Sequence, residues 1–317
     1  MIGIVSEHDH VYGNMVSRYY YGVAMSAFDT VPILRHNTLI DNSIGAWCYQ
    51  CGAYIENNII SGGAGGLYLQ YSPSPYVANN TISLSLPYYG GIDVYGGNPE
   101  IVNNSISRAT WGIRVIGGAP EIHGNNRLEN NSEYGLYVAG TLPFNVTDNN
   151  TFKNNGVGGI YLGTDSNVRI GEDNVIAYNS QYGIKIQGGN ATISNRNIIH
   201  RNQYGIYMDT TYAPWIKDNN TIHNNTNIGI WVSASTNPVI RWNIIENNAN
   251  YGVYKGAGSY FDCKCNWWKS DLGPNDSSDD RPTGYYNPNP SGEPVSDRVD
   301  YVNWWRKSTG LCDGTPP

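Results

Sequence analysis

The feature that most constrains the fold is a repeat of about 23 residues that runs through most of the chain. Its first mark is a glycine followed by a small aliphatic residue, and successive glycines are 21 to 25 residues apart. These glycines are Gly22, Gly45, Gly66, Gly91, Gly112, Gly135, Gly159, Gly183, Gly205, Gly229 and Gly252. A repeat this short that lacks helical periodicity indicates one coil of short strands and turns.

The second mark is an asparagine that stands 8 to 11 residues before each glycine. The asparagines are Asn14, Asn37, Asn58, Asn80, Asn104, Asn126, Asn150, Asn174, Asn197, Asn220 and Asn243, and Asn266 extends the series. An aliphatic residue usually follows two positions later, and apolar and polar residues alternate after the glycine, as in Ile184-Lys185-Ile186. This alternation is typical of strands with one buried face.

The spacing Ile101-x-x-Asn104-x-Ile106 resembles that of right-handed parallel β-helices. It is most similar to the Asn-rich repeats in carbohydrate-binding and sugar-hydrolase domains of secreted proteins. The resemblance covers roughly residues 11–268 and implies an all-β, single-stranded right-handed parallel β-helix of about 11 rungs. It also implies that an asparagine lies at a tight left-handed bend between two strands. Lyases, hydrolases, adhesins and structural proteins share this fold, so the resemblance implies no single activity.

The asparagine register predicts a buried ladder. An amide both donates and accepts hydrogen bonds, so stacked amides satisfy each other where unpaired polar groups would be costly. A further asparagine column begins in the middle of the chain, at Asn131, Asn155, Asn179, Asn202, Asn225 and Asn248.

The repeat predicts two regions, the coil at residues 1–268 and a C-terminal loop and capping segment at 269–317. The run Cys265-Asn266-Trp267-Trp268 and the later Gly273-Pro274 turn resemble the closing segment of Asn-rich β-helices. A solenoid needs such a cap because its last rung exposes core and strand edges. Met1–Val11 shows no capping pattern.

Five cysteines leave at least one thiol unpaired within the chain. Cys48-x-x-Cys51 is compatible with a zinc half-site or a redox pair. A bond from Cys263 or Cys265 to Cys312 would hold the C-terminal tail in an oxidising compartment.

Composition excludes some partners. The formal net charge is -7, and no basic patch occurs, which argues against nucleic acid. No apolar run is long enough to span a membrane, and no signal peptide is visible. We nevertheless expect an extracellular or cell-surface location, because the resemblance is to secreted proteins.

The residue two positions after each glycine points outward, and this column is rich in aromatics. It predicts a binding surface at Trp47, Tyr68, Tyr137, Tyr161, Tyr207, Trp231 and Tyr254. Such a surface suits a polysaccharide or another subunit, and the alternative is cross-strand stacking that only stabilises the sheet. Aromatics that directly precede the glycine, such as Tyr182 and Tyr204, are expected to form an internal or turn-packed stack.

The sequence contains only weak candidates for catalytic residues. Asp148 and Glu172 fall on successive rungs and would suit paired-carboxylate chemistry on sugars, although a solvated acidic face is the simpler interpretation. Asp93 beside Arg114 is expected to be an exposed ion pair worth under about 1 kcal/mol. No cofactor is expected. Ca²⁺ is a candidate in the loop 275–280, where a solvated turn is favoured.

Sequons at Asn79, Asn103, Asn149 and Asn219 immediately precede ladder positions and are candidates for glycosylation. Together these patterns favour a non-enzymatic extracellular structural or adhesive solenoid, associating with copies of itself in a filament or surface layer, or with polysaccharide. The alternatives are a polysaccharide lyase or glycoside hydrolase, and a carbohydrate-binding module.

Overall fold

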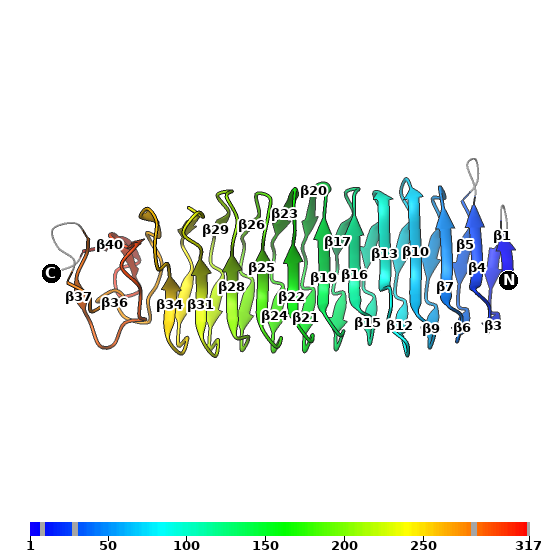
Figure 1. Ribbon diagram of the computed structural model, residues 1–317, viewed down its shortest axis with the longest axis horizontal. Helices are drawn as coiled ribbons and strands as arrows, with labels where there is room; N and C mark the ends of the chain where they lie inside the picture. The colour runs from blue at the N-terminus through cyan, green and yellow to red at the C-terminus, as the bar shows by residue number, and fades with distance from the viewer. Residues whose placement is uncertain (7–9, 27–30, 280–283, 316–317) are drawn as a thin grey trace. The chain divides into compact units, whose positions relative to one another are not determined.

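The computed structural model describes residues 1–6, 10–26, 31–279 and 284–315. These residues form strands and turns and contain no helix, and therefore no helix that could cross a membrane. They divide into two compact units, Met1–Gly159 and Ile160–Pro317. In each unit the chain passes through three parallel sheets, A, B and C, in turn (Figure 1). The predicted all-β class and parallel coil of about 11 turns are confirmed.

Sheet A has the longest strands. In the first unit they are β1 (Ile2–Ser6), β4 (Tyr21–Ser26), β7 (Ile44–Tyr49), β10 (Gly65–Ser72), β13 (Gly90–Gly97), β16 (Trp111–Ile116) and β19 (Tyr134–Ala139). β22 (Gly158–Leu162) contains the boundary between the units, and β25 (Tyr182–Ile186), β28 (Tyr204–Met208), β31 (Ile228–Val232) and β34 (Tyr251–Tyr254) follow.

Sheet B in the first unit consists of β2 (His10–Tyr12), β5 (Ile33–Arg35), β8 (Tyr54–Glu56), β11 (Tyr76–Ala78), β14 (Glu100–Val102), β17 (Glu121–His123) and β20 (Thr141–Val146). In the second unit it consists of β23 (Ser166–Ile170), β26 (Thr192–Ile193), β29 (Trp215–Lys217) and β32 (Val239–Arg241).

Sheet C in the first unit consists of β3 (Met15–Ser17), β6 (Thr38–Ile40), β9 (Ile59–Ser61), β12 (Thr81–Ser83), β15 (Ser105–Ser107), β18 (Arg127–Glu129) and β21 (Thr151–Lys153). In the second unit it consists of β24 (Val175–Ala177), β27 (Ile198–His200), β30 (Thr221–His223) and β33 (Ile244–Glu246).

The strand register places residues of the same type directly over one another on successive rungs. Ile82 pairs with Ile106 in sheet C, and Ile206 pairs with Ile230 in sheet A. All four side chains are buried. The period of 23 residues therefore brings each aliphatic position directly over the next, and burial of these columns is the main source of stability.

Two ladders of buried asparagine run beside this core. In the first, Asn104 Oδ1 accepts from the backbone N–H and the Nδ2 of Asn80, both at 3.0 Å. Asn104 Nδ2 donates to Val77 O at 2.9 Å and to Asn126 Oδ1 at 3.2 Å. The same pattern recurs at Asn37, Asn58 and Asn197. Asn42 occupies the place of the second ladder on an earlier rung.

The left-handed bend was assigned to the wrong residue. The positive φ belongs to the residue before each ladder asparagine, as at Asn103 (φ 51°), Trp242 (φ 59°) and Cys265 (φ 57°). The ladder asparagine itself turns inward, where its amide is buried from Asn37 onward, whereas Asn14 on the first rung is exposed. The second ladder uses the same arrangement, with Arg201 (φ 54°) before Asn202.

The repeated glycine is required by close approach rather than by φ. A Cβ on Gly205 would lie 2.5 Å from Gly229 O and 2.8 Å from Asn225 Nδ2. A side chain there would clash with the neighbouring rung and its ladder amide.

The C-terminal segment ends the coil. It contains β35 (Phe261–Asp262), β36 (Asn275–Asp276), β37 (Asn287–Pro288), β38 (Val299–Asp300), β39 (Trp304–Arg306) and β40 (Leu311–Gly314). Glu293, which is buried, ends the second ladder, because its carboxylate accepts from Asn248 N (2.7 Å), Asn248 Nδ2 (2.9 Å) and Asn247 N (2.7 Å). Nearby, the buried Lys255 Nζ donates to Thr236 O at 2.6 Å and Asn237 Oδ1 at 2.8 Å.

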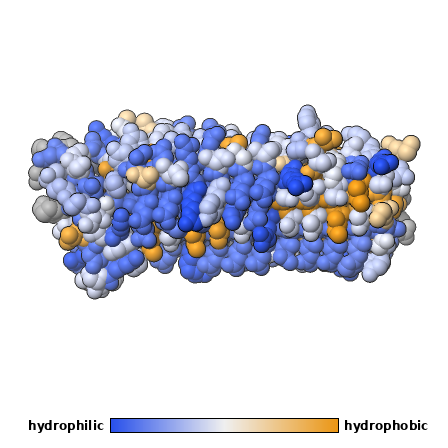
Figure 2. Space-filling model, turned by 90° about the horizontal axis from the view of Figure 1, so that it is seen from below, coloured by the Kyte–Doolittle hydropathy of each residue, from blue (hydrophilic) through white to orange (hydrophobic). Residues whose placement is uncertain are grey.

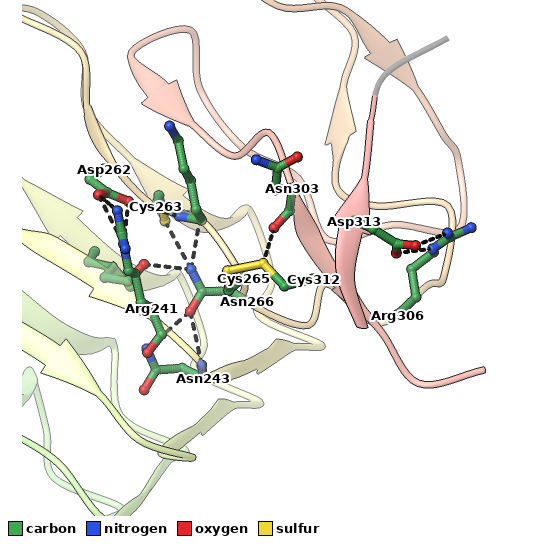
Figure 3. Close-up of a disulfide and its surroundings, with 12 residues drawn as sticks. Arg241, Asn243, Asp262, Cys263, Cys265, Asn266, Asn303, Arg306, Cys312 and Asp313 are labelled. Carbon is green, nitrogen blue, oxygen red and sulfur yellow. Dashed lines mark hydrogen bonds and ion pairs between the residues drawn. A yellow bond between two sulfur atoms is a disulfide. The ribbon is translucent and has the colours of Figure 1, made fainter. Parts of the chain in front are cut away.

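Two disulfides are present. Cys265 bonds to Cys312 and so ties β40 to the rung that holds Asn266, the last member of the first ladder (Figure 3). Cys263 remains a buried thiol, and burial raises its pKa well above the ordinary value. Cys48 bonds to Cys51, so the zinc half-site prediction is wrong and the redox-pair alternative remains.

Candidate functional site

The outer face of sheet A is the candidate site in each unit. The seven aromatics predicted to form a binding surface all lie on strands of this sheet and are half-buried. The face shown in Figure 2 is mostly hydrophilic, with hydrophobic residues in small groups. Scattered apolar residues of this kind need no functional explanation, whereas contiguous aromatics do.

In the first unit this face contains a buried ion pair. Asp93 and Arg114 are register partners on β13 and β16, and Arg114 Nε lies 2.6 Å from Asp93 Oδ1. Their side chains are only 2% and 14% exposed, and Gly90 N also donates to Asp93 Oδ2 at 3.1 Å. The predicted exposed ion pair is therefore wrong, because neighbouring rings cover it.

Two aromatic rings lie against this ion pair, and their burial of it shifts the pKa values of both partners. Arg114 Cζ lies 4.6 Å from the Trp111 ring centre and 5.1 Å from that of Tyr95. Burial raises the pKa of Asp93, although Arg114 opposes the rise. Burial alone would lower the pKa of Arg114, but the Asp93 carboxylate outweighs it and raises that pKa. Arg114 Nη2 and Trp111 Nε1 are buried and have no acceptor among the described residues, so this cluster retains two unused donors.

The other predicted residues of the first unit pack against neighbouring rungs. Trp47 stacks on Tyr21 with ring centres 5.1 Å apart, and Tyr68 lies 4.9 Å from Tyr95. Burial, together with the charges of Tyr95 and Asp93, raises the pKa of Tyr68 to about 12. Cross-strand ring contacts of this kind stabilise a sheet, and the binding role of these residues remains a prediction.

In the second unit five residues form what we call the tyrosine platform: Tyr182, Lys185, Tyr204, Tyr207 and Trp231. The rings of Tyr207 and Trp231 are parallel within 2° and 4.2 Å apart, so they cover one face of each other and present edges. Tyr182 and Tyr204 are 5.8 Å apart, more than the strand spacing of about 4.8 Å. These two rings therefore overlap only in part and leave ring surface uncovered.

The aromatics that precede each glycine belong to the same face. Tyr182 and Tyr204 pack edge-on against Tyr207 at 5.1 and 5.7 Å, and Tyr251 lies 5.1 Å from Tyr254. The predicted stack is present, since Tyr182 and Tyr204 stack on each other, but these two rings are half-buried rather than internal and widen the outer face. Lys185 Nζ lies 5.0 Å from the Tyr182 ring centre and adds a positive charge.

The predicted catalytic carboxylates lie in different units, and each has its own neighbour. Asp148 is exposed, with Oδ2 3.9 Å from His123 Nδ1, and Glu172 Oε1 lies 3.1 Å from Arg169. Both occupy positive-φ bend positions. Their pairing remains a prediction.

A second pair of carboxylates was missed. Glu100 and Glu121 are register partners in sheet B and line a groove of about 630 Å³ together with Tyr76 and Phe144. Glu100 also lies 3.0 Å from His123 Nε2. The rung spacing alone would have aligned these two glutamates, had the outward column of sheet B been compared.

The four sequon asparagines are exposed and occupy positive-φ bends. Asn103 Nδ2 donates to Asn79 Oδ1 at 2.6 Å, so two of these amides contact each other on adjacent rungs. Their glycosylation remains a prediction.

In the predicted calcium loop Asp276 is buried and accepts from Ser278 Oγ at 2.8 Å, whereas Asp280 lies outside the described residues. Within the described ranges no three His, Cys, Asp or Glu side chains form a group suited to a metal.

Comparison with protein families gives one match. The family described as right handed beta helix region matches residues 4–149 and 144–266. No curated protein and no solved structure matches the chain.

Proposed function

Because the chain belongs to the right-handed β-helix family, we propose that it is a non-enzymatic extracellular solenoid that holds a polysaccharide against the outer face of sheet A. It would serve as a structural or adhesive element. The observation that carries the proposal is the tyrosine platform, where partly uncovered rings lie beside exposed polar groups.

The chemistry of this surface suits a sugar chain. Sugar rings pack their C–H faces on aromatic rings, and their hydroxyls bond to Tyr O–H, Trp N–H and ammonium groups. Successive rungs are about 4.8 Å apart, close to the repeat of an extended polysaccharide, so one sugar can contact each rung. The two disulfides support an oxidising, extracellular location.

The test is retention of the protein in gels that contain neutral or acidic polysaccharides. Tyr182→Ala and Tyr204→Ala should abolish retention, while Tyr178→Ala, which removes an exposed ring outside the platform, should leave it unchanged. Retention by none of the polysaccharides would overturn the proposal. Concentration-dependent assembly that is lost in the same variants would instead assign this face to self-association.

A second candidate function is hydrolysis of a glycan in the groove of Glu100 and Glu121. Carboxylates about 5 Å apart suit a retaining mechanism, and Glu100 and Glu121 project from register partners on strands about 4.8 Å apart. Release of reducing sugar by the wild type that is lost in Glu100→Gln and Glu121→Gln, but not in Glu133→Gln, would establish it. A polysaccharide that is retained but never cleaved would favour the binding function.

A further inference from the structure

We propose that the pocket between the end of sheet A and the C-terminal segment binds one unit of a neutral sugar chain. This deepens the proposed function and rests on it, since the same face would deliver the chain to this pocket. The pocket has a volume of about 550 Å³, which is within the range of small-molecule sites.

One wall of the pocket continues the aromatic face. Tyr251 and Tyr254 on β34 both line it, with ring centres 5.1 Å apart and planes inclined by 52°. The two rings therefore form an open V rather than a closed stack. A sugar ring that packs on either face would bury its C–H groups there.

The opposite wall is fixed by backbone contacts. Val253 and Val295 form a parallel bridge, so the segment around Val295 adds to the edge of β34. Ser296 Oγ accepts from Lys255 N at 2.7 Å and donates to Lys255 O at 3.1 Å. The pocket is thus built on anchored segments.

Polar side chains with unused hydrogen-bond donors and acceptors line the rest of the pocket. Asn250 Nδ2 donates to Asn227 Oδ1 at 2.7 Å, which leaves Asn227 Nδ2 as a donor and Asn250 Oδ1 as an acceptor. Ser277 and Asn275 add a hydroxyl and a third amide. Alternating donors and acceptors beside an aromatic wall match the hydroxyls of a sugar ring.

The charges around the pocket select against acidic sugars. Asp297 brings a carboxylate to the lining, and its Oδ1 lies 2.5 Å from Ser278 Oγ. Lys255 also lines the pocket, but its ammonium is directed to Thr236 O and Asn237 Oδ1. No other basic side chain lines the pocket among the described residues, so a uronate would meet a like charge without a counter-ion.

The test uses isothermal titration of the full chain with neutral trisaccharides (cellotriose, xylotriose, mannotriose and chitotriose) and with trigalacturonate. We expect at least one neutral trisaccharide to bind. Asn250→Ala and Tyr254→Ala should weaken it at least about tenfold, since loss of a central contact commonly has this effect. Asn190→Ala is the matched control, because it removes an exposed amide outside the pocket.

The pocket assignment would be overturned if no neutral trisaccharide binds, if Asn250→Ala and Ser277→Ala bind as the wild type does, or if trigalacturonate binds as tightly as the neutral sugars. Because Asn250 is exposed, its replacement leaves the fold intact and keeps the test valid if Tyr254→Ala unfolds. Polysaccharide retention separates the two proposals. If retention depends on Tyr204 but not on Asn250, the proposed function stands and the pocket assignment fails.

Discussion

At the residue scale, two neighbouring residues at each bend have different structural roles. The first adopts positive φ and faces solvent, and the second points inward and joins the ladder. The sequence predicted the inward ladder position and the outward position before it, but not which of the two takes the positive φ, because Asn suits both conformations and several rungs carry Asn-Asn. The distinguishing signal was in the chain: the first position also holds His36, Trp242 and Cys265, while the second holds only Asn.

This division predicts opposite outcomes for two adjacent substitutions. Asn104→Gly removes the acceptor for Asn80 and should lower the free energy of unfolding by about 1–3 kcal/mol for each buried group left unpaired. Asn103→Gly should change it by less than about 0.5 kcal/mol, because glycine tolerates positive φ at an exposed site. Urea denaturation of both variants measures the difference, and equal losses would contradict the assignment.

The aromatic column was also predictable from spacing, whereas the burial of Asp93 was not. The outward direction follows from strand alternation, which needs only the sequence. The burial of Asp93 depends on how Trp111 and Tyr95 fold over Arg114, and spacing does not specify ring orientation.

At the scale of elements, the C-terminal segment ends the polar ladders with different groups. Asn266 ends the first and Glu293 the second, while Lys255 donates to the carbonyl of Thr236. A cap was predicted from its tryptophans, but Glu293 was missed because it lies 45 residues beyond Asn248 and outside the repeat.

The raised pKa of Glu293 predicts that the free energy of unfolding depends on pH. Burial raises its pKa, so the folded chain holds this proton at pH values where the unfolded chain has released it. Its contribution to the free energy of unfolding should therefore fall as pH rises from 4.5, its ordinary pKa, to the folded-state value. Glu293→Gln should abolish this slope in denaturation curves recorded from pH 4 to 8, and an unchanged slope would show that another group is responsible.

The two disulfides are expected to contribute unequally to stability. Cys265–Cys312 spans 47 residues and Cys48–Cys51 only 3. Loop-closure entropy therefore assigns about 4 kcal/mol to the first and about half of that to the second. Cys312→Ser should speed proteolysis of the C-terminal segment, while the double variant Cys48→Ala/Cys51→Ala should leave that rate unchanged. Equal cleavage rates in Cys312→Ser and the wild type would contradict this role.

At the scale of the whole molecule, membership of the β-helix family accounts for the scaffold and leaves function to the surface. The repeat could be predicted because each rung obeys the same steric and hydrogen-bonding rules. The candidate sites could be predicted only in part, because the platform and the pocket depend on non-repeating residues such as Lys185, Ser277 and Asp297.

The central claim is that inward residues carry stability and outward residues of sheet A carry binding. The most direct test compares two residues of one rung, Asn202, which accepts from Asn179 N and Nδ2 at 3.0 Å, and Tyr204. We predict that Asn202→Ala lowers the free energy of unfolding by about 1–3 kcal/mol per unpaired group and keeps polysaccharide retention. Tyr204→Ala should abolish retention, and each ring pair that it removes accounts for about 0.5–1.5 kcal/mol in addition to the area buried. The claim would be contradicted if, in both variants, the loss of polysaccharide retention were proportional to the loss in free energy of unfolding.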